Sequence, residues 1–259
     1  MAALRALGYC DTGNAKEKIV TDDTGPSDAL HKSLKVDIAQ SSPGNELGLA
    51  NAGYWGMAVR PSTIYRGSFY AKAERVGSAH ARLVSDETGV TLAETTVDVK
   101  DGDWQRYSYN LKTAADVKPR VKNHLEIPFA HPGSASFQLV SLFPPTFHDR
   151  PDGNRPDVME MLAAMHPFFL RLPGGNYLEG DTIEERFDWR ETVGPLVDRP
   201  TYRSPWNYQS TDGMGLLEFL EWCEDLKMDP VSLSRLFKMR WMRSNMSREM
   251  RARSGVRRG

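Results

Sequence analysis

The sequence FFLRLPGGN at residues 168–176 decides the fold class of the second half of this chain. Its first five residues are mostly apolar and have the length of a buried parallel strand, and Pro-Gly-Gly then turns the chain. Arg171 and Asn176 flank this turn. In a β/α barrel, residues that follow a strand lie at the mouth of the active site, so the stretch predicts a functional loop.

Helices are predicted on both sides of this strand. The upstream helix begins near Pro156 and has one apolar stripe, formed by Val158, Met161, Leu162 and Met165. The downstream helix has an apolar side with Leu216, Phe219, Leu220, Cys223 and Leu226, and its Glu218, Glu221 and Glu224 can face water. A strand-like segment, MDPV, follows at 228–231. This alternation is typical of a β/α barrel or a doubly wound sheet.

The pattern from about residue 33 to 144 is different, with short segments bounded by Gly, Pro, Asp and Asn. Seven segments have strand length: 33–39, 65–75, 81–85, 91–99, 104–111, 124–129 and 136–143. Several alternate, and Tyr107, Tyr109 and Leu111 share one face. An Asp-Gly turn is expected at 101–102. This region therefore predicts an antiparallel β-sandwich.

The whole chain divides into four parts. They are a linker or remnant at 1–30, a β-sandwich at 31–144, a partial β/α barrel at 145–231 and a basic tail at 232–259. The tail has nine Lys or Arg against one acid, Glu249, and lacks a regular apolar stripe. Such a segment is expected to be disordered or non-native, for example from a misread exon boundary.

Composition excludes several classes of protein. The chain is 40% hydrophobic, and its net charge of −1, with 33 basic and 34 acidic residues, gives no field for nucleic acid or anionic lipid. No apolar run reaches the roughly 18 residues of a membrane span. The first residues, MAALRALGYCDTGNAKEK, show no signal peptide. Cys10 and Cys223 make no disulfide framework.

Arg171, Asn176 and Trp206 are the candidate binding residues. Arg171 has five donors in a fixed fork, and Asn176 can both donate and accept, which suits a hydroxyl-rich ligand or the orientation of a carboxylate. A buried ion pair beside a glycine turn explains Arg171 equally well. Trp206 is either an aromatic platform for a sugar ring or a core side chain. Taken alone, the residue favours the core interpretation.

Other candidates have simpler explanations. Four acids, Asp181, Glu184, Glu185 and Asp188, suggest acid/base chemistry, but a solvated loop commonly carries such charges. His148-Asp149 is interpreted as part of a turn. The six histidines show no metal-ligand spacing, and no phosphate-binding loop is present, so no metal and no cofactor is expected.

These segments resemble a known family. RLPGGNYLEGDTIEERFDWRETVGPLVDRP (171–200), SPWNY (204–208) and STDGMGLLEFLEWCEDL (210–226) resemble the barrel of family 51 α-L-arabinofuranosidases of the fungal and plant-like branch. SLKVDI, NAGYWGMAV, YRGSFYAK and DWQRYSYNL resemble the carbohydrate-binding-module-like sandwich of those enzymes. The resemblance covers about residues 20–231.

The resemblance implies a retaining, extracellular hydrolase that removes terminal non-reducing α-L-arabinofuranosyl groups from arabinan, arabinoxylan or related plant polysaccharides. It assigns Arg171, Asn176 and, less surely, Trp206 to sugar binding. The family's acid/base and nucleophile glutamates follow later barrel strands, so no catalytic residue is expected in this sequence and the chain is expected to be inactive alone. Asn45-Glu46 is interpreted as a chance echo of the acid/base motif.

Two alternatives remain open. One is a non-catalytic carbohydrate-binding sandwich that uses exposed aromatic residues such as Trp55, Tyr65 or Trp104, although these rings fit a sandwich core equally well. The other is a nucleic-acid binder that uses the basic tail, which the neutral overall charge disfavours.

Overall fold

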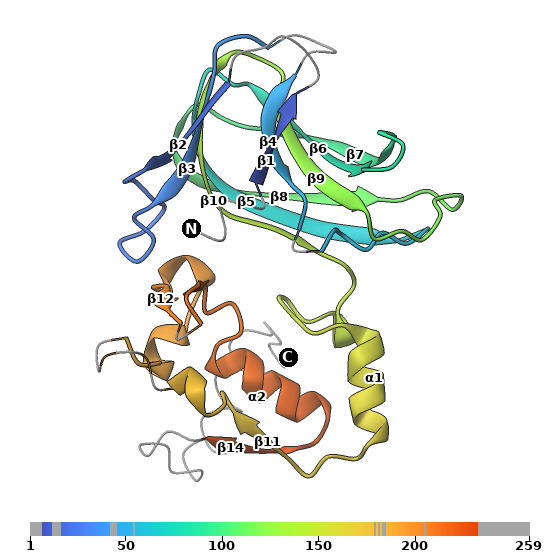
Figure 1. The fold of residues 1–259 in the computed structure, drawn as a ribbon, viewed down its shortest axis with the longest axis vertical. Helices are drawn as coiled ribbons and strands as arrows, with labels where there is room; N and C mark the ends of the chain where they lie inside the picture. Colours follow the sequence, from blue (N-terminus) through green and yellow to red (C-terminus); the bar gives the residue numbers. More distant parts are fainter. Residues whose placement is uncertain are drawn as a thin grey trace, which may run out of the picture.

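The computed structural model describes residues 7–11, 17–41, 46–53, 55–178, 180, 182, 185–204 and 206–232. Strands form the first half of the chain, and helices with short strands form the second (Figure 1). In Figure 1 the sheets lie above the helical unit, and the chain passes from one to the other after β10. The basic tail predicted at 232–259 lies outside the described residues, apart from the backbone of Ser232.

The first half consists of two antiparallel five-stranded sheets. One sheet has the order β1 (Leu7–Asp11), β4 (Leu47–Asn51), β9 (Asn123–Phe129), β6 (Ser78–Ser85) and β7 (Thr91–Asp98). The other has the order β2 (Glu17–Asp22), β3 (Ser33–Ile38), β10 (Gly133–Phe143), β5 (Ile64–Glu74) and β8 (Gly102–Lys112). All seven segments predicted from the sequence form strands.

Both sheets bury their inner faces in one hydrophobic core. The ring centroid of Phe137 lies 5.5 Å from that of Phe69 and 5.6 Å from that of Phe129. Buried and exposed positions alternate along β5, as expected for a strand with one covered face. Tyr109 and Leu111 are buried, as the strand pattern predicts. Each fully buried side chain of this size contributes roughly 1.5–3 kcal/mol.

The expectation of a linker at 1–30 was wrong for two segments. Residues 7–11 form β1, which pairs with β4, and residues 17–22 form β2, which pairs with β3. Both are edge strands with one neighbour each. Their backbone hydrogen bonds to distant strands compensate for a weak local pattern, and tertiary context often overrides strand propensity in this way.

The second half contains a parallel strand pair covered by a helix. β11 (Phe169–Leu172) pairs with β14 (Asp229–Ser232), and Phe169 lies opposite Asp229. Helix α2 (Leu216–Asp225) lies between them in sequence, and a second core contains Leu172, Leu216, Leu220, Cys223 and Met228. The predicted strands, the helix and its apolar face are therefore confirmed. Two parallel strands do not close a barrel, and the described residues contain none.

Short elements connect these parts. They are η2 (Phe147–Asp149), α1 (Pro156–Ala164), η3 (Asn176–Leu178), η4 (Trp189–Thr192), η5 (Leu196–Asp198), β12 (Tyr202–Arg203) and β13 (Gln209–Ser210). β12 and β13 form a small antiparallel hairpin. Among the described residues, no helix combines the length and the apolar character that crossing a bilayer requires.

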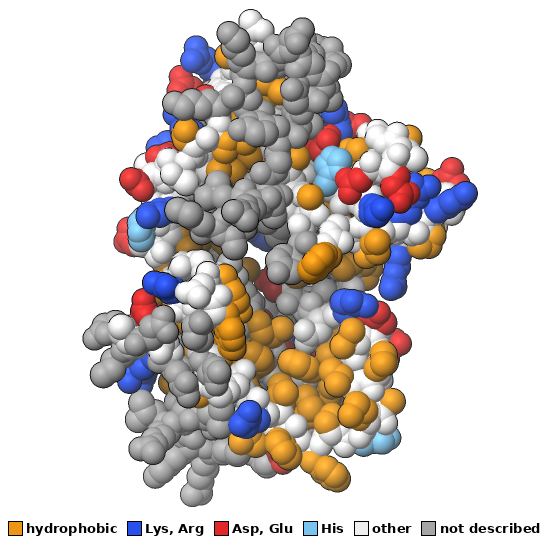
Figure 2. Space-filling view, viewed as in Figure 1, with side chains coloured by type: hydrophobic (Ala, Val, Ile, Leu, Met, Phe, Trp, Pro, Cys, Tyr) orange, Lys and Arg blue, Asp and Glu red, His pale blue; other side chains and the backbone are white. Residues whose placement is uncertain are grey.

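Most of the apolar stripe predicted for the helix at Pro156 is exposed: of its four residues only Leu162 is partly buried. Met161 and Met165 are 73% and 75% exposed, and Met159 is the buried residue of the helix. Phe168 is 89% exposed, so the FFLRL strand is not buried on both sides. Figure 2 shows the resulting apolar patch at the lower right, over α1. Helical spacing determines which residues share a face, but only a packing partner buries that face.

Candidate functional site

The loop after β11 is built as the sequence predicts. Leu170 and Leu172 pack toward α2, so strand alternation directs Arg171 to the opposite face, where it is exposed. The chain then turns through Gly174, whose φ of +132° favours glycine. Asn176 begins η3, but its side chain lies outside the described part of the chain. Arg171 is therefore not the buried ion-pair residue of the alternative interpretation.

An aromatic cluster follows this loop directly. The ring of Tyr177 lies 5.2 Å from Phe187, 5.4 Å from Tyr202 and 6.3 Å from Trp206, measured between centroids. Trp206 stacks on Tyr208 with an interplanar angle of 13°. The structure thus brings Trp206 to the residue that follows Asn176, from a segment about 30 residues downstream.

Trp206 is 51% exposed and Tyr208 is 47% exposed, so the expectation that Trp206 is a core residue was wrong. The hairpin of β12 and β13 explains this exposure, because its loop projects both rings away from the core. The loop is held by Ser204, whose hydroxyl accepts a hydrogen bond from the Trp206 backbone N–H at 3.2 Å. A half-exposed indole beside a second ring forms an apolar platform.

Three hydrogen-bonded polar side chains, Tyr177, Ser210 and Asp212, extend from the aromatic cluster. The hydroxyls of Tyr177 and Ser210 share a hydrogen bond of 2.9 Å, and Ser210 Oγ donates to Asp212 Oδ1 at 3.4 Å. Asp212 is only 4% exposed, and burial raises the pKa of its carboxyl to about 6. Burial also raises the pKa of Tyr202, whose phenol therefore stays neutral at physiological pH.

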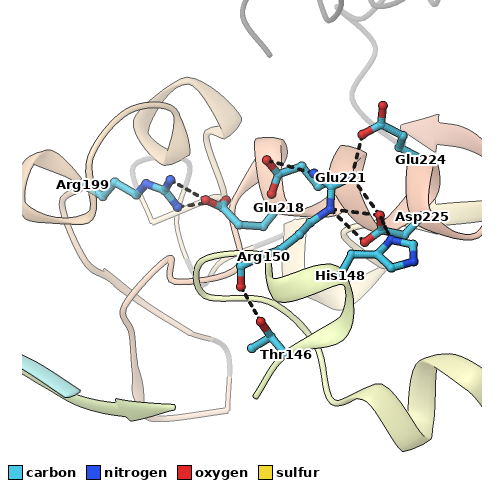
Figure 3. Close-up of polar contacts among 8 residues, drawn as sticks. All are labelled: Thr146, His148, Arg150, Arg199, Glu218, Glu221, Glu224 and Asp225. Carbon is cyan, nitrogen blue, oxygen red and sulfur yellow. Dashed lines mark hydrogen bonds and ion pairs between the residues drawn. The ribbon is translucent and has the colours of Figure 1, made fainter. Parts of the chain in front are cut away.

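Arg199 connects the segment at residues 194–212, which carries Trp206, to helix α2. Its side chain is 2% exposed and donates to Glu218 Oε1 at 2.8 Å (Figure 3). It also donates to the Gly194 carbonyl at 2.8 Å. Nη1 of Arg199 also donates to the backbone carbonyl of Asp212 at 2.8 Å. Glu218 in turn accepts a hydrogen bond from the Gly215 N–H at the start of α2. These contacts give the aromatic cluster a fixed position relative to β11.

Two of the three α2 acids expected to face water, Glu218 and Glu221, are largely covered, while Glu224 is exposed as expected. Arg150, which follows η2, lies 2.7 Å from Glu224, 3.6 Å from Glu221 and 2.8 Å from Asp225 (Figure 3). These acids raise the pKa of Arg150. Helical periodicity predicted the polar side of α2 but not the arginines, which come from distant loops.

Residues 147–150 form a turn, as expected for His148-Asp149, and this turn contacts both halves of the molecule. His148 Nδ1 lies 2.9 Å from Asp225 of α2, and Asp149 accepts two hydrogen bonds from Arg66 of β5. The turn thereby links the second sheet to the helical unit.

The four-acid segment gives no paired carboxylates among the described residues. Asp181 and Glu184 lie outside them, and Asp188 caps η4 by accepting from the Arg190 N–H at 3.0 Å. Glu46, the second residue of the Asn45-Glu46 pair, pairs with Arg82 on the first sheet. Asn45 itself lies outside the described residues. Within the described chain, no group of three His, Cys, Asp or Glu side chains is placed to hold a metal ion.

Sequence reasoning did not single out Tyr177, Tyr208 and Asp212. The aromatic residues of RLPGGNY and SPWNY were visible in the sequence, but 26 residues separate the two motifs. Asp212 carries no sequence signal that distinguishes it from a surface acid, because its raised pKa follows mainly from burial.

Comparison with known proteins places this arrangement in a family. Residues 161–237 match the model of the alpha-L-arabinofuranosidase 1 domain. The chain is 38% identical over 218 residues to a probable alpha-L-arabinofuranosidase A of Aspergillus terreus, and 35% identical over 216 residues to alpha-L-arabinofuranosidase A of Aspergillus niger. This chain belongs to the α-L-arabinofuranosidase family. Each alignment covers 82% of this chain but 34% of the relative, so the chain spans about a third of those arabinofuranosidases.

A solved structure shows the same similarity in three dimensions. The arabinose-bound MgGH51 α-L-arabinofuranosidase superposes with a TM-score of 0.80 at 35% identity, covering 89% of this chain and 38% of that one. Both the two-sheet unit and the helical unit therefore follow the arrangement of an arabinofuranosidase, since the superposition covers most of the chain.

Proposed function

We propose that this chain carries a sugar-binding part of an α-L-arabinofuranosidase that removes terminal non-reducing α-L-arabinofuranosyl residues from arabinan or arabinoxylan. The observation that carries the proposal is the half-exposed stack of Trp206 on Tyr208, next to the loop of Arg171 and Asn176. A ring face covers the apolar C–H surface of a furanose, while donors from the loop bind its hydroxyls.

The proposed architecture extends the described one. The two-sheet unit is proposed to be a carbohydrate-binding-module-like β-sandwich, supported by its shared core. β11, α2 and β14 are proposed to be part of a (β/α)8 barrel, supported by the parallel pairing and the covering helix. In such a barrel the loop that follows β11, with Arg171 near the carboxyl end of the strand, lies at the mouth, where ligands bind.

The reaction proposed for the family proceeds with retention. Two carboxyl groups about 5–5.5 Å apart then act as acid/base and as nucleophile. The carboxylates described near the aromatic cluster are already engaged, because Asp212 is buried and Glu218 pairs with Arg199. We therefore expect this chain to bind the sugar without cleaving it. Its substrates are extracellular plant polymers, so we propose an extracellular site of action.

Isothermal titration of the chain with methyl α-L-arabinofuranoside tests the proposal. Trp206→Ala is expected to weaken binding about tenfold or more, because it removes the apolar platform. Phe168→Ala is the matched control, since Phe168 is also an exposed aromatic side chain but precedes β11 rather than following it. Equal affinity of wild type and Trp206→Ala would contradict the proposed site.

Hydrolysis of 4-nitrophenyl α-L-arabinofuranoside provides the second measurement. No turnover is expected from the chain. Release of nitrophenol by the wild type, lost in Glu218→Gln or Asp212→Asn, would show that one of these carboxylates is catalytic and would overturn that part of the proposal.

A further inference from the structure

A concave surface lies on the two-sheet unit and shares no lining residue with the aromatic cluster. It is an open groove of about 580 Å³ between the loop that joins β2 to β3 and the start of β8. Its lining includes Ser27, Asp28 and His31 from the loop, and Asp103 and Trp104 from β8.

The loop wall of this groove is held in place by contacts on both sides. Ser27 accepts a hydrogen bond from the Leu30 N–H at 3.1 Å and donates to the carbonyl of Val197 in η5. Leu30 is buried, and the loop closes so tightly that a Cβ on Gly25 would lie 1.4 Å from the Leu30 carbonyl oxygen. The groove is therefore preformed, which lowers the entropic cost of binding a ligand.

Trp104 gives the groove its apolar surface. It precedes the inward-facing positions of β8, and its side chain is half-buried rather than part of the core. The three aromatic residues considered in the sequence analysis thus separate. Tyr65 is a core residue that is 4% exposed, with its hydroxyl bonded to backbone groups, and Trp55 is 85% exposed outside the groove. Of these three aromatic residues, only Trp104 lines the groove.

The charges of the groove narrow the class of ligand. Asp28 and Asp103 are exposed acids, and no Lys or Arg is among the described residues that line the groove. A negative surface repels polyuronates, phosphates and nucleic acids. Carboxylates and hydroxyls beside an indole instead match a neutral sugar chain, which offers hydroxyl donors and an apolar ring face.

We propose that this groove binds a neutral oligosaccharide, with Trp104 stacked on one sugar ring and Asp28 and Asp103 accepting hydrogen bonds from its hydroxyls. Because Ser27 bonds to Val197, the groove lies where the loop meets the second unit, and a bound polymer extends along that junction. The choice of arabinose-containing chains as the ligand rests on the proposed function. The groove and its chemistry do not.

Titration of the full chain with a linear α-1,5-arabino-oligosaccharide tests this inference. Trp104→Ala is expected to weaken binding about tenfold or more, and Asp28→Ala about threefold. Trp55→Ala is the matched control and should change the affinity by less than about twofold, because this tryptophan lies on the same unit outside the groove. Asp28→Ala decides the question if Trp104→Ala fails to fold, as judged by circular dichroism.

The variants also separate this inference from the proposed function. Loss of oligosaccharide affinity in Trp104→Ala, with unchanged binding of methyl α-L-arabinofuranoside, supports a second site whether or not Trp206 matters. Unchanged oligosaccharide affinity in both Trp104→Ala and Asp28→Ala would overturn it, even if Trp206→Ala loses the monosaccharide. Equal affinity for polygalacturonate would also overturn it, because the acidic groove should repel that polymer.

Discussion

Arg150 and Asp225 form a bidentate ion pair across 75 residues of sequence, with Nε and Nη2 of the arginine 2.8–3.0 Å from the carboxylate oxygens. The Asp225 side chain is 5% exposed and that of Arg150 is 23% exposed. A carboxylate so well covered needs its partner, since an unpaired buried charge is strongly unfavourable. The pair thus anchors the segment that links the sheets to α2.

Arg150→Ala is expected to lower the free energy of unfolding by about 2–4 kcal/mol, because Asp225 loses its main partner. Urea denaturation measures the change. Arg155→Ala is the matched control, since its pair with Asp157 is exposed to solvent and should contribute little to stability. Similar losses for both variants would show that burial does not distinguish the two pairs.

Arg199→Met is expected to cost about 3–5 kcal/mol, because it leaves the largely buried Glu218 without a charged partner. The double variant Arg199→Met, Glu218→Met should recover at least about 1 kcal/mol of this loss, since it removes the orphaned charge. Recovery will be partial because the carbonyls of Gly194 and Asp212 also lose a donor. A double variant less stable than the single one would contradict this account.

Asp212 should make stability depend on pH. Its pKa rises from 3.8 to about 6 on folding, so the folded state binds the proton more tightly than the unfolded state. The stabilisation is present below pH 4 and is lost as the pH rises through 6. Melting temperatures of wild type should fall across this range relative to Asp212→Asn. A carboxyl carbon resonance of Asp212 that titrates near pH 4 would refute the shift.

Gly174→Ala should destabilise the loop after β11 by about 1–2 kcal/mol, because a φ of +132° is strained for any residue with a Cβ. Gly175→Ala is the control, since a Cβ at either glycine meets no atom within 4 Å and Gly175 lacks the positive φ. Thermal melts of the two variants check the difference. Equal stability of the two variants would show that the positive φ of Gly174 is not the cause of any loss.

Much of the fold was predictable from local patterns. The seven strand segments and the helices at Pro156 and Leu216 follow from residue spacing, because a strand or helix repeats its exposure with a fixed period. β1, β2 and β4 were missed, since short strands with weak alternation depend on their neighbours for stability.

The candidate site was predictable in part. The RLPGGN loop was identified from its glycines and its place after a strand, and SPWNY from its tryptophan. Their juxtaposition through Tyr177 was not predictable, because nothing local links the two motifs. The same limit applies to Ser27 and Val197, which are 170 residues apart.

The sequence by itself therefore determined most of the elements, their apolar faces and the family. Only the tertiary structure decided which faces are covered: it exposed Trp206 and most of the stripe of α1, and it buried Asp212 and the Arg199–Glu218 pair. The physical reason is that periodicity depends on the backbone within one element. Burial and charge pairing depend on residues that fold back from distant parts of the chain.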